Sequence, residues 1–161
     1  MKLLSINVFL ALAWSALWNG FSLPNLLAGF VIGYCALWFA RDLIAQGDER
    51  RYFRALPQTL VLIAYFIKEL VKSSIMVARD CIAPRPNLHP AIVRMPLDGQ
   101  SDAEIFLLAS LITLTPGTLT LDVAEDRSAL LVHSIYATDE AALVADLKSG
   151  MERRIGKVFR P

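Results

Sequence analysis

The first quarter of the chain is almost entirely apolar. No charged side chain occurs in residues 3–40, a stretch longer than the roughly 20 residues that cross a bilayer once. The turn-forming sequence NGFSLPN divides this stretch into two apolar segments, residues 3–18 and 26–40. The pattern predicts a short transmembrane helical hairpin within residues 1–42.

The second apolar segment contains Gly29 and Gly33, which are four positions apart. Small residues at this spacing let another helix approach closely, although two glycines can also be tolerated without any packing role. Aromatic side chains gather near the ends of both segments, as expected at the two membrane–water interfaces. We interpret Gly29 and Gly33 as helix-packing positions.

An arginine-rich segment follows the hairpin. Residues 41–56 contain four arginines, which are Arg41, Arg50, Arg51 and Arg54. Basic residues collect in the cytoplasmic loops of membrane proteins. The segment is therefore predicted to face the cytoplasm, with the turn of the hairpin on the other side of the membrane.

Polar and apolar positions then alternate with the period of a helix over residues 57–80, and Pro57 suits a first helical position. Lys68, Glu69 and Lys72 belong to the polar stripe of this amphipathic helix. Because charges inside a membrane are costly, an interfacial helix is favoured over a third span, which stays the alternative. An ion relay through Lys68 and Glu69 is less favoured, since long side chains near an interface usually extend toward water.

Three prolines in residues 83–90 interrupt regular structure and mark a linker. The segment beyond it predicts strands and helices in the order β-α-β-β-α, at residues 91–97, 101–114, 118–123, 129–136 and 139–155. This is a small α+β domain with helices on one face of an antiparallel or mixed sheet. The predicted organisation is a hairpin, an Arg-rich loop with an amphipathic helix, a linker and this domain, over residues 1–42, 43–82, 83–90 and 91–161.

The uncharged run at residues 105–121 resembles a last membrane span. A capping box formed by Ser101 and Glu104 precedes it, however, and starts a helix. Pro116 and Gly117 suit the centre of a type II turn, and alternating Thr and Leu follow. The run therefore predicts a helix, a turn and a strand inside the α+β domain.

Composition agrees with a two-part membrane protein. Of 161 residues, 55% are hydrophobic and the mean hydropathy is +0.48, which is high for a soluble domain. Residues 1–89 hold nine Lys/Arg against five Asp/Glu, whereas residues 90–161 hold seven against ten. There is no basic patch with interleaved aromatics, so nucleic-acid binding is not expected. The two cysteines and two histidines have no catalytic, cofactor or metal-ligand spacing, so we expect no enzyme site and no cofactor.

Residues 111–123, LITLTPGTLTLDV, followed by Arg127 and by Val132-His133, closely resemble the E subunit of the Mrp-type multisubunit cation/proton antiporters. The order of parts along the whole chain is also similar to that family. The resemblance implies a complex in the bacterial inner membrane that exchanges Na+ or K+ for protons, in which this subunit is a small accessory chain. It implies no catalytic residues, and the matching positions are taken as structural or contact positions: Thr115, Pro116, Gly117, Thr118 and Asp122.

These observations predict a non-catalytic subunit that supports the assembly and stability of an antiporter. Its partners are then the other hydrophobic subunits and the lipid bilayer, and the α+β domain lies in the cytoplasm. The alternative is a membrane-tethered adaptor or sensor whose α+β domain binds a protein or a small ligand. The sequence leaves open the choice between Na+ and K+ and the choice between two and three spans.

Overall fold

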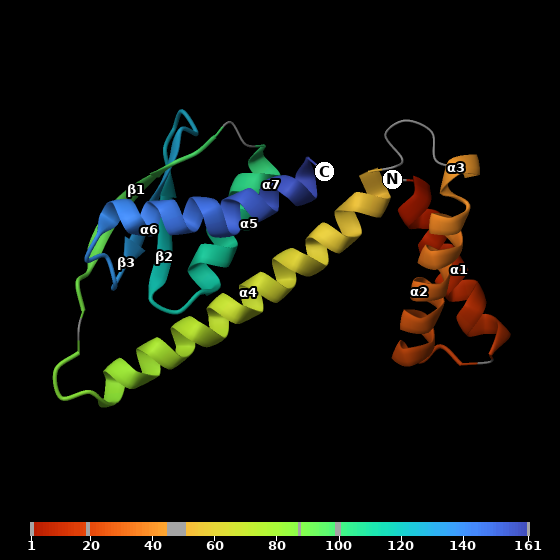
Figure 1. The fold of residues 1–161 in the computed structure, drawn as a ribbon, viewed down its shortest axis with the longest axis horizontal. Helices are drawn as coiled ribbons and strands as arrows, with labels where there is room; N and C mark the ends of the chain where they lie inside the picture. Colours follow the sequence, from red (N-terminus) through yellow and green to blue (C-terminus); the bar gives the residue numbers. More distant parts are fainter. Residues whose placement is uncertain (1, 19, 45–50, 87, 99–100, 161) are drawn as a thin grey trace. The chain divides into compact units, whose positions relative to one another are not determined.

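The computed structural model describes residues 2–18, 20–44, 51–86, 88–98 and 101–160 (Figure 1). Its contacts group the chain into two compact units, residues 1–57 and 58–161. The first unit is helical and the second combines helices with a small sheet. We describe each unit by itself.

The N-terminal unit is built on two helices, α1 (Lys2–Leu17) and α2 (Leu23–Phe39), followed by the short α3 (Arg41–Ile44). Ser22 caps α2, because its hydroxyl accepts the Asn25 N–H at 3.4 Å. The Asn25 side-chain amide donates to the Gly20 carbonyl at 2.9 Å and closes the connection. The two-helix arrangement predicted from the apolar pattern is therefore present.

The interface between α1 and α2 is formed by small and polar residues. A Cβ placed at Gly29 would lie 2.8 Å from the Trp14 Cβ and 2.9 Å from the Ala11 Cα. At Gly33 the same addition would meet the Asn7 side chain. The two helices approach this closely because both positions lack a side chain.

Among the described residues, no helix is both long enough and apolar enough to cross a membrane. The transmembrane part of the hairpin prediction is therefore not confirmed. The reason is length, since the 16 residues of α1 and the 17 of α2 rise only about 25 Å, against a hydrocarbon core of about 30 Å.

Helix α4 (Arg51–Ile82) is longer than predicted and begins earlier. Pro57 lies inside this helix, so its predicted place at the helix start is wrong. A proline inside a helix leaves the carbonyl four residues before it without its usual partner. Here that carbonyl belongs to Phe53, and it accepts the Tyr34 hydroxyl at 3.2 Å. The tertiary contact replaces the missing hydrogen bond and lets the helix continue through the proline.

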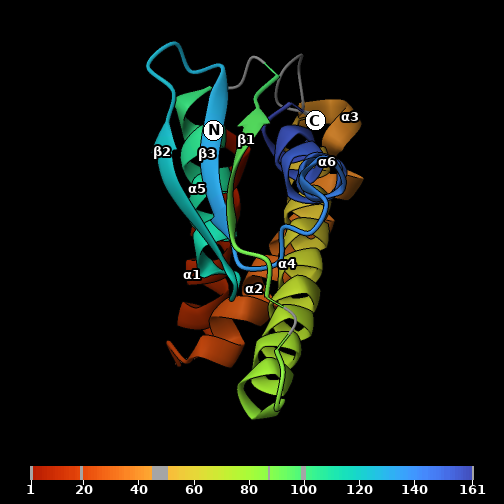
Figure 2. The ribbon, with the colours of Figure 1, turned by 90° about the vertical axis from the view of Figure 1, so that its left-hand side faces the viewer.

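The C-terminal unit contains a three-stranded antiparallel sheet in the order β1-β3-β2 (Figure 2). The strands are β1 (Ala91–Pro96), β2 (Thr118–Val123) and β3 (Ala129–Ser134). In the register, Val132 of β3 faces Val93 and Thr120, and a bulge follows between Thr120 and Asp122. The Thr120 N–H donates to the Thr113 hydroxyl at 3.2 Å, so the edge strand β2 is tied to the helix beside it.

The helices of this unit are α5 (Asp102–Leu114), α6 (Glu140–Leu147) and α7 (Arg153–Phe159), with a π-turn at Lys148–Glu152 between the last two. The β-α-β-β-α order and the small antiparallel sheet are confirmed. The single last helix predicted for residues 139–155 is instead interrupted by the π-turn. That turn brings Gly150 against the Tyr65 ring, where a side chain would collide with the hydroxyl.

One apolar core holds the C-terminal unit together. Its fully buried side chains come from the sheet, α5 and α7: Met95, Leu108, Ile112, Leu130, Val132 and Ile155. Leu62 of α4 joins this core, so α4 packs with the segment that follows the proline-rich stretch. By contacts, the boundary between the two compact units lies near Pro57. The boundary expected from the sequence was the proline-rich segment at 83–90.

Local signals in the sequence are reproduced closely in this unit. Ser101 and Glu104 form the predicted capping box, in which the Ser101 N–H donates to the Glu104 carboxylate at 2.9 Å. The run at residues 105–121 is divided into α5, a turn and β2, as predicted. The open face of the sheet carries exposed apolar residues, including Ile92, Leu119 and Leu121.

Candidate functional site

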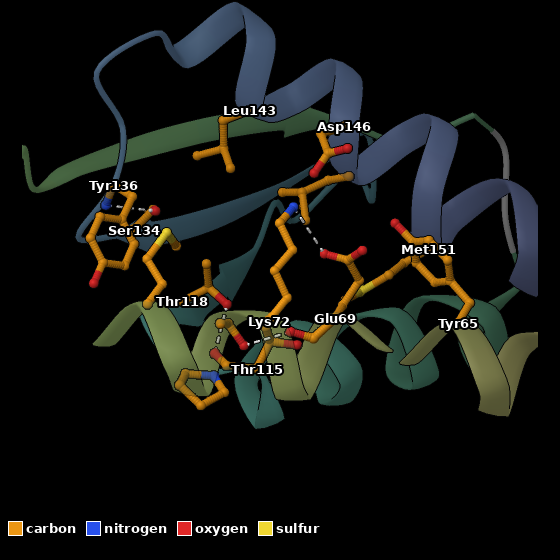
Figure 3. Close-up of a pocket in the computed structure, with 14 residues that line it drawn as sticks. Tyr65, Glu69, Lys72, Thr115, Thr118, Ser134, Tyr136, Leu143, Asp146 and Met151 are labelled. Atoms are coloured by element: carbon orange, nitrogen blue, oxygen red, sulfur yellow. Dashed lines mark hydrogen bonds and ion pairs between the residues drawn. The ribbon is translucent and has the colours of Figure 1, made fainter. Parts of the chain in front are cut away.

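A pocket lies between α4, the turn at residues 115–118, the end of β3, and α6 (Figure 3). We call it the α4–turn pocket. Its cavity volume is about 120 Å³. It is lined mainly by apolar surface, and its polar lining residues are Tyr65, Glu69, Lys72, Ser73, Thr115, Thr118, Ser134, Tyr136 and Asp146.

The turn that forms one wall is the type II turn expected from the sequence. Gly117 has a φ of 91°, which the third position of such a turn requires, and the Thr118 N–H donates to the Thr115 carbonyl at 3.2 Å. The Thr118 hydroxyl donates to the Ile112 carbonyl at 2.7 Å, so it also satisfies the end of α5. These hydrogen bonds fix the conformation of the turn. The Thr118 hydroxyl proton is already donated within the unit.

Helix α4 supplies the opposite wall. The Glu69 carboxylate lies 3.6 Å from the amino groups of both Lys68 and Lys72. The Glu69 side chain is only 15% exposed, whereas Lys68 and Lys72 are 72% and 65% exposed. The Glu69 side chain is therefore largely buried in the unit, whereas Lys68 is exposed outside the pocket. Lys72 is also exposed, but part of it lines the pocket.

A hydrogen bond joins the segment just after β3 to the last turns of α4 at the margin of the pocket. The Tyr136 hydroxyl donates to the Asp80 carboxylate at 2.5 Å. The hydrogen bond to Asp80, followed by burial and the negative charge of Asp80, raises the pKa of Tyr136 to about 12. Tyr136 therefore stays neutral at physiological pH, as a structural donor.

Tyr65 closes the pocket near α6 and the π-turn. The Arg154 guanidinium stacks 3.8 Å from the centre of the Tyr65 ring, and it also donates to the Gly150 carbonyl at 2.8 Å. The cation is thus held between the ring and the π-turn. This arrangement fixes the last helices of the unit on α4.

The pocket is small and has few groups of the kinds that bind metals. Sites for small molecules usually enclose about 300–1,000 Å³, well above this volume. Its lining side chains contain neither histidine nor cysteine. Among the described residues, no group of three or more His, Cys, Asp or Glu side chains is placed to hold a metal ion. Its lining side chains contribute mainly apolar packing surface, and Thr118 and Tyr136 already donate hydrogen bonds within the unit.

Several residues singled out in the sequence meet in this pocket. Thr115, Pro116 and Thr118 from the motif lie opposite Glu69 and Lys72 from the polar stripe. Gly117 shapes the turn without being counted among the lining residues.

Other predicted site residues lie elsewhere. Asp122 sits at the β2 bulge, where its carboxylate accepts the Val123 N–H at 2.8 Å, and it is not part of the pocket. Lys68 faces away from the pocket, and Gly29 and Gly33 belong to the other unit. Whether any of these positions contacts a partner stays a prediction.

The sequence pattern did not indicate the contact between Tyr136 and Asp80 or the contact between Tyr65 and Arg154. Asp80 and Tyr136 are 56 positions apart, so no local pattern joins them. A tyrosine on the polar side of an amphipathic helix, as at position 65, was the available signal, because a partly buried tyrosine usually has a polar partner.

The fold defines the class of protein. One chain combines an apolar two-helix unit with a small α+β unit that holds a small pocket. The chain belongs to the family of Na+/H+ ion antiporter subunits, whose family model matches residues 7–158.

Individual relatives agree with this assignment. The chain is 33% identical to the E subunit of the Na(+)/H(+) antiporter of Bacillus subtilis (strain 168), over 96% of both chains. It is 34% identical to the E1 subunit of the Na(+)/H(+) antiporter of Staphylococcus haemolyticus (strain JCSC1435), over 95% of this chain and 94% of the relative.

Two solved structures are also similar. A chain in the structure of the Mrp complex from Dietzia sp. DQ12-45-1b has a TM-score of 0.51 and 32% identity, covering 64% of this chain and 96% of that one. A chain of the membrane-bound sulfane sulfur reductase, an archaeal respiratory membrane complex, has a TM-score of 0.60 over 96% of both chains. Its 22% identity makes this second likeness one of fold.

Proposed function

We propose that this chain is a non-catalytic accessory subunit of a multisubunit monovalent cation/proton antiporter and that it supports the assembly and stability of the complex. The observation that carries the proposal is the family match over residues 7–158, which includes both units of the chain. The names of the relatives favour Na+ as the exchanged cation. The other hydrophobic subunits of the complex are its partners.

The surface of the N-terminal unit supports a position within lipid and among hydrophobic subunits. Large apolar side chains point outward, with Phe9 69% and Phe39 89% exposed, while Asn7 and Ser15 are fully buried. Water disfavours such a surface, and a membrane favours it. The shortness of the two helices suits a locally thinned bilayer. The arginines after α2 favour a cytoplasmic position for this end and for the α+β unit.

The charge pattern supports an accessory role rather than ion conduction. Pathways for ions and protons through membranes are built from polar and ionisable side chains on facing helices. The uncharged stretch at residues 3–40 supplies no ionisable acid or base except the tyrosine and cysteine at positions 34 and 35. Ion movement is therefore assigned to other subunits of the complex.

The test is deletion of this subunit from a bacterium that carries the complete antiporter. Antiport is measured as cation-dependent proton release in everted vesicles, and assembly is measured by native electrophoresis of the detergent-solubilised complex. We expect both to be lost and both to return with the intact gene. Undiminished antiport and assembly after deletion would rule the proposal out.

A membrane-tethered adaptor or sensor is the alternative, and the small volume of the α4–turn pocket does not favour it. Purification of the tagged chain in mild detergent separates the two functions. Several hydrophobic subunits co-purify with an antiporter subunit, whereas an adaptor is recovered as a monomer or a homodimer.

A further inference from the structure

Helix α4 divides its charged residues between its two faces. The acidic side chains are held by the C-terminal unit: Glu69 lies in the α4–turn pocket and Asp80 accepts the Tyr136 hydroxyl. The basic side chains Lys68, Lys72 and Arg79 are exposed. The single polar stripe read from the sequence is thus split, and the face that the unit leaves uncovered has a net positive charge.

An apolar stripe runs beside these basic residues along the same uncovered face. At 100° per residue, its members fall within about 80° of one another around the helix axis. All of them are exposed: Leu60, Ala64, Ile67, Val71, Ile75, Ala78 and Ile82. Lys68, Lys72 and Arg79 follow on one flank of the stripe, about 60–100° around the helix from its centre. The stripe is longer than four turns, so it is a continuous surface rather than a scatter of single residues.

A shallow groove lies where the stripe meets the basic flank. Apolar side chains of Ile67, Val71 and Ile75 line it together with Lys68, Lys72 and Arg79. Asp80 also lines the groove, but its carboxylate accepts the Tyr136 hydroxyl, so the three cations exceed the acidic charge there. The ion pairs of Lys68 and Lys72 with Glu69 are 3.6 Å long and largely exposed, so they hold the two amino groups only weakly. The groove therefore offers an apolar wall and cationic groups within one short segment.

We propose that this face of α4 rests on a lipid surface rich in anionic headgroups, with the apolar stripe among the upper acyl chains and the three basic side chains at the lipid phosphates. Helices with an apolar stripe and basic flanks bind in the membrane interface in this way. Each basic residue near an anionic surface strengthens such binding by about 1 kcal/mol, or roughly fivefold. This inference rests on the proposed function in one respect, because a subunit of an antiporter has a membrane beside it.

The charge pattern favours lipid over a protein partner as the occupant. A purely apolar partner helix would add no negative charge for Lys68, Lys72 and Arg79, whose only acidic neighbour in the ion pairs of the described residues is the Glu69 shared by the two lysines. Phosphates along a membrane surface complement all three cations at once. The apolar stripe by itself does not distinguish the two occupants, so the test depends on the basic flank.

The experiment places a spin label at Ala78 in the full-length chain, after Cys35 and Cys81 have been replaced by serine. The chain is reconstituted into vesicles of phosphatidylethanolamine and phosphatidylglycerol, and the label's accessibility to oxygen and to a water-soluble nickel complex is compared. Ala103→Cys, an exposed alanine at the start of α5, serves as the matched control. We expect the label at 78 to favour oxygen and the label at 103 to favour the nickel complex.

The charge-removal variant K68Q/K72Q/R79Q tests the basic flank. We expect it to raise the nickel accessibility of the label at 78 severalfold in phosphatidylglycerol vesicles, as will 0.5 M salt or replacement of the anionic lipid by phosphatidylcholine. The triple variant R94Q/R153Q/K157Q removes the same charge from exposed positions outside α4 and is expected to change nothing.

Equal nickel accessibility at 78 and 103 in anionic vesicles overturns the proposal. Protection at 78 that appears only in the purified antiporter, and not in vesicles with the chain alone, also overturns it and identifies a partner subunit as the occupant. These outcomes do not depend on the deletion test above, because antiport and assembly can be lost whether or not α4 contacts lipid.

Discussion

The two units of this chain differ in what they bury. In the N-terminal unit, glycine, serine and asparagine are buried beside Leu3, Ala11 and Leu37, and many large apolar side chains face outward. In the C-terminal unit, Met95, Leu108 and Ile112 are completely buried and the capping and turn residues are polar. The first arrangement is stable when the surroundings are apolar, and the second when they are aqueous. The two units thus differ in the surroundings that favour them.

The difference between the two units predicts that truncating a side chain in the core of the C-terminal unit destabilises that unit alone. Ile112→Ala removes a completely buried side chain from the C-terminal core, so we expect a loss of about 2–5 kcal/mol in its free energy of unfolding. All three tryptophans lie in the N-terminal unit, at positions 14, 18 and 38. Hydrogen exchange of peptides from β1 to β3 in the detergent-purified chain should therefore accelerate while tryptophan fluorescence stays constant.

The control for this variant is Leu114→Ala, at a side chain that is 61% exposed on the same helix. Its effect should stay within about 0.5 kcal/mol. If Ile112→Ala altered the tryptophan signal as strongly as the exchange rates, the two units would not be energetically separate.

A second prediction concerns the close approach of α1 and α2. Gly33→Leu places a side chain where the Asn7 side chain already lies, so overpacking should destabilise the hairpin by about 1–3 kcal/mol. The measurement is the thermal midpoint of tryptophan fluorescence in detergent micelles. Ala36→Leu adds the same side chain at an exposed position of α2 and should leave the midpoint unchanged. Equal shifts for the two variants would show that the glycine is not needed for packing.

The smallest expected effect is a pH dependence confined to the C-terminal unit. Burial raises the pKa of Glu104, but hydrogen bonds from Ser101 and the charge of Arg160 outweigh it and hold the pKa below the usual range of a glutamate. A carboxyl whose pKa is lower in the folded state stabilises the fold above its unfolded pKa, and this contribution disappears as pH falls through the folded pKa.

Glu104→Gln removes this contribution. We expect a loss of about 1 kcal/mol at pH 7 and a weaker fall of the urea midpoint, followed by circular dichroism, as the pH is lowered from about 5 to about 2. Glu125→Gln, at the exposed tip between β2 and β3, is the matched control. An unchanged acid dependence in Glu104→Gln would mean that other carboxylates are responsible.

Features that depend on neighbouring residues could be predicted from the sequence. The capping box at Ser101 and the turn at Pro116-Gly117 are set by local backbone geometry, so their residue types identify them. The strand at Thr118–Val123 follows from its alternation of Thr and Leu. These short-range rules gave the order of elements in the C-terminal unit.

Features that depend on distant contacts could not be predicted. Pro57 is tolerated inside α4 because Tyr34, far away in the sequence, satisfies the Phe53 carbonyl. The candidate site was predicted as two separate parts, the motif turn and the polar stripe. The turn and the polar stripe meet in one pocket because α4 packs on the core through Leu62. The helical period of α4 does not specify this packing.

The bond between the Thr120 N–H and the Thr113 hydroxyl has a consequence for the chain before it joins any complex. An edge strand normally presents free donors to which a strand of another molecule can add, the first step of aggregation. At this position the donor is already used by α5, and the adjacent bulge disturbs the regular spacing that an added strand needs. Both features make β2 a less favourable edge for the addition of a strand from a second copy of the subunit.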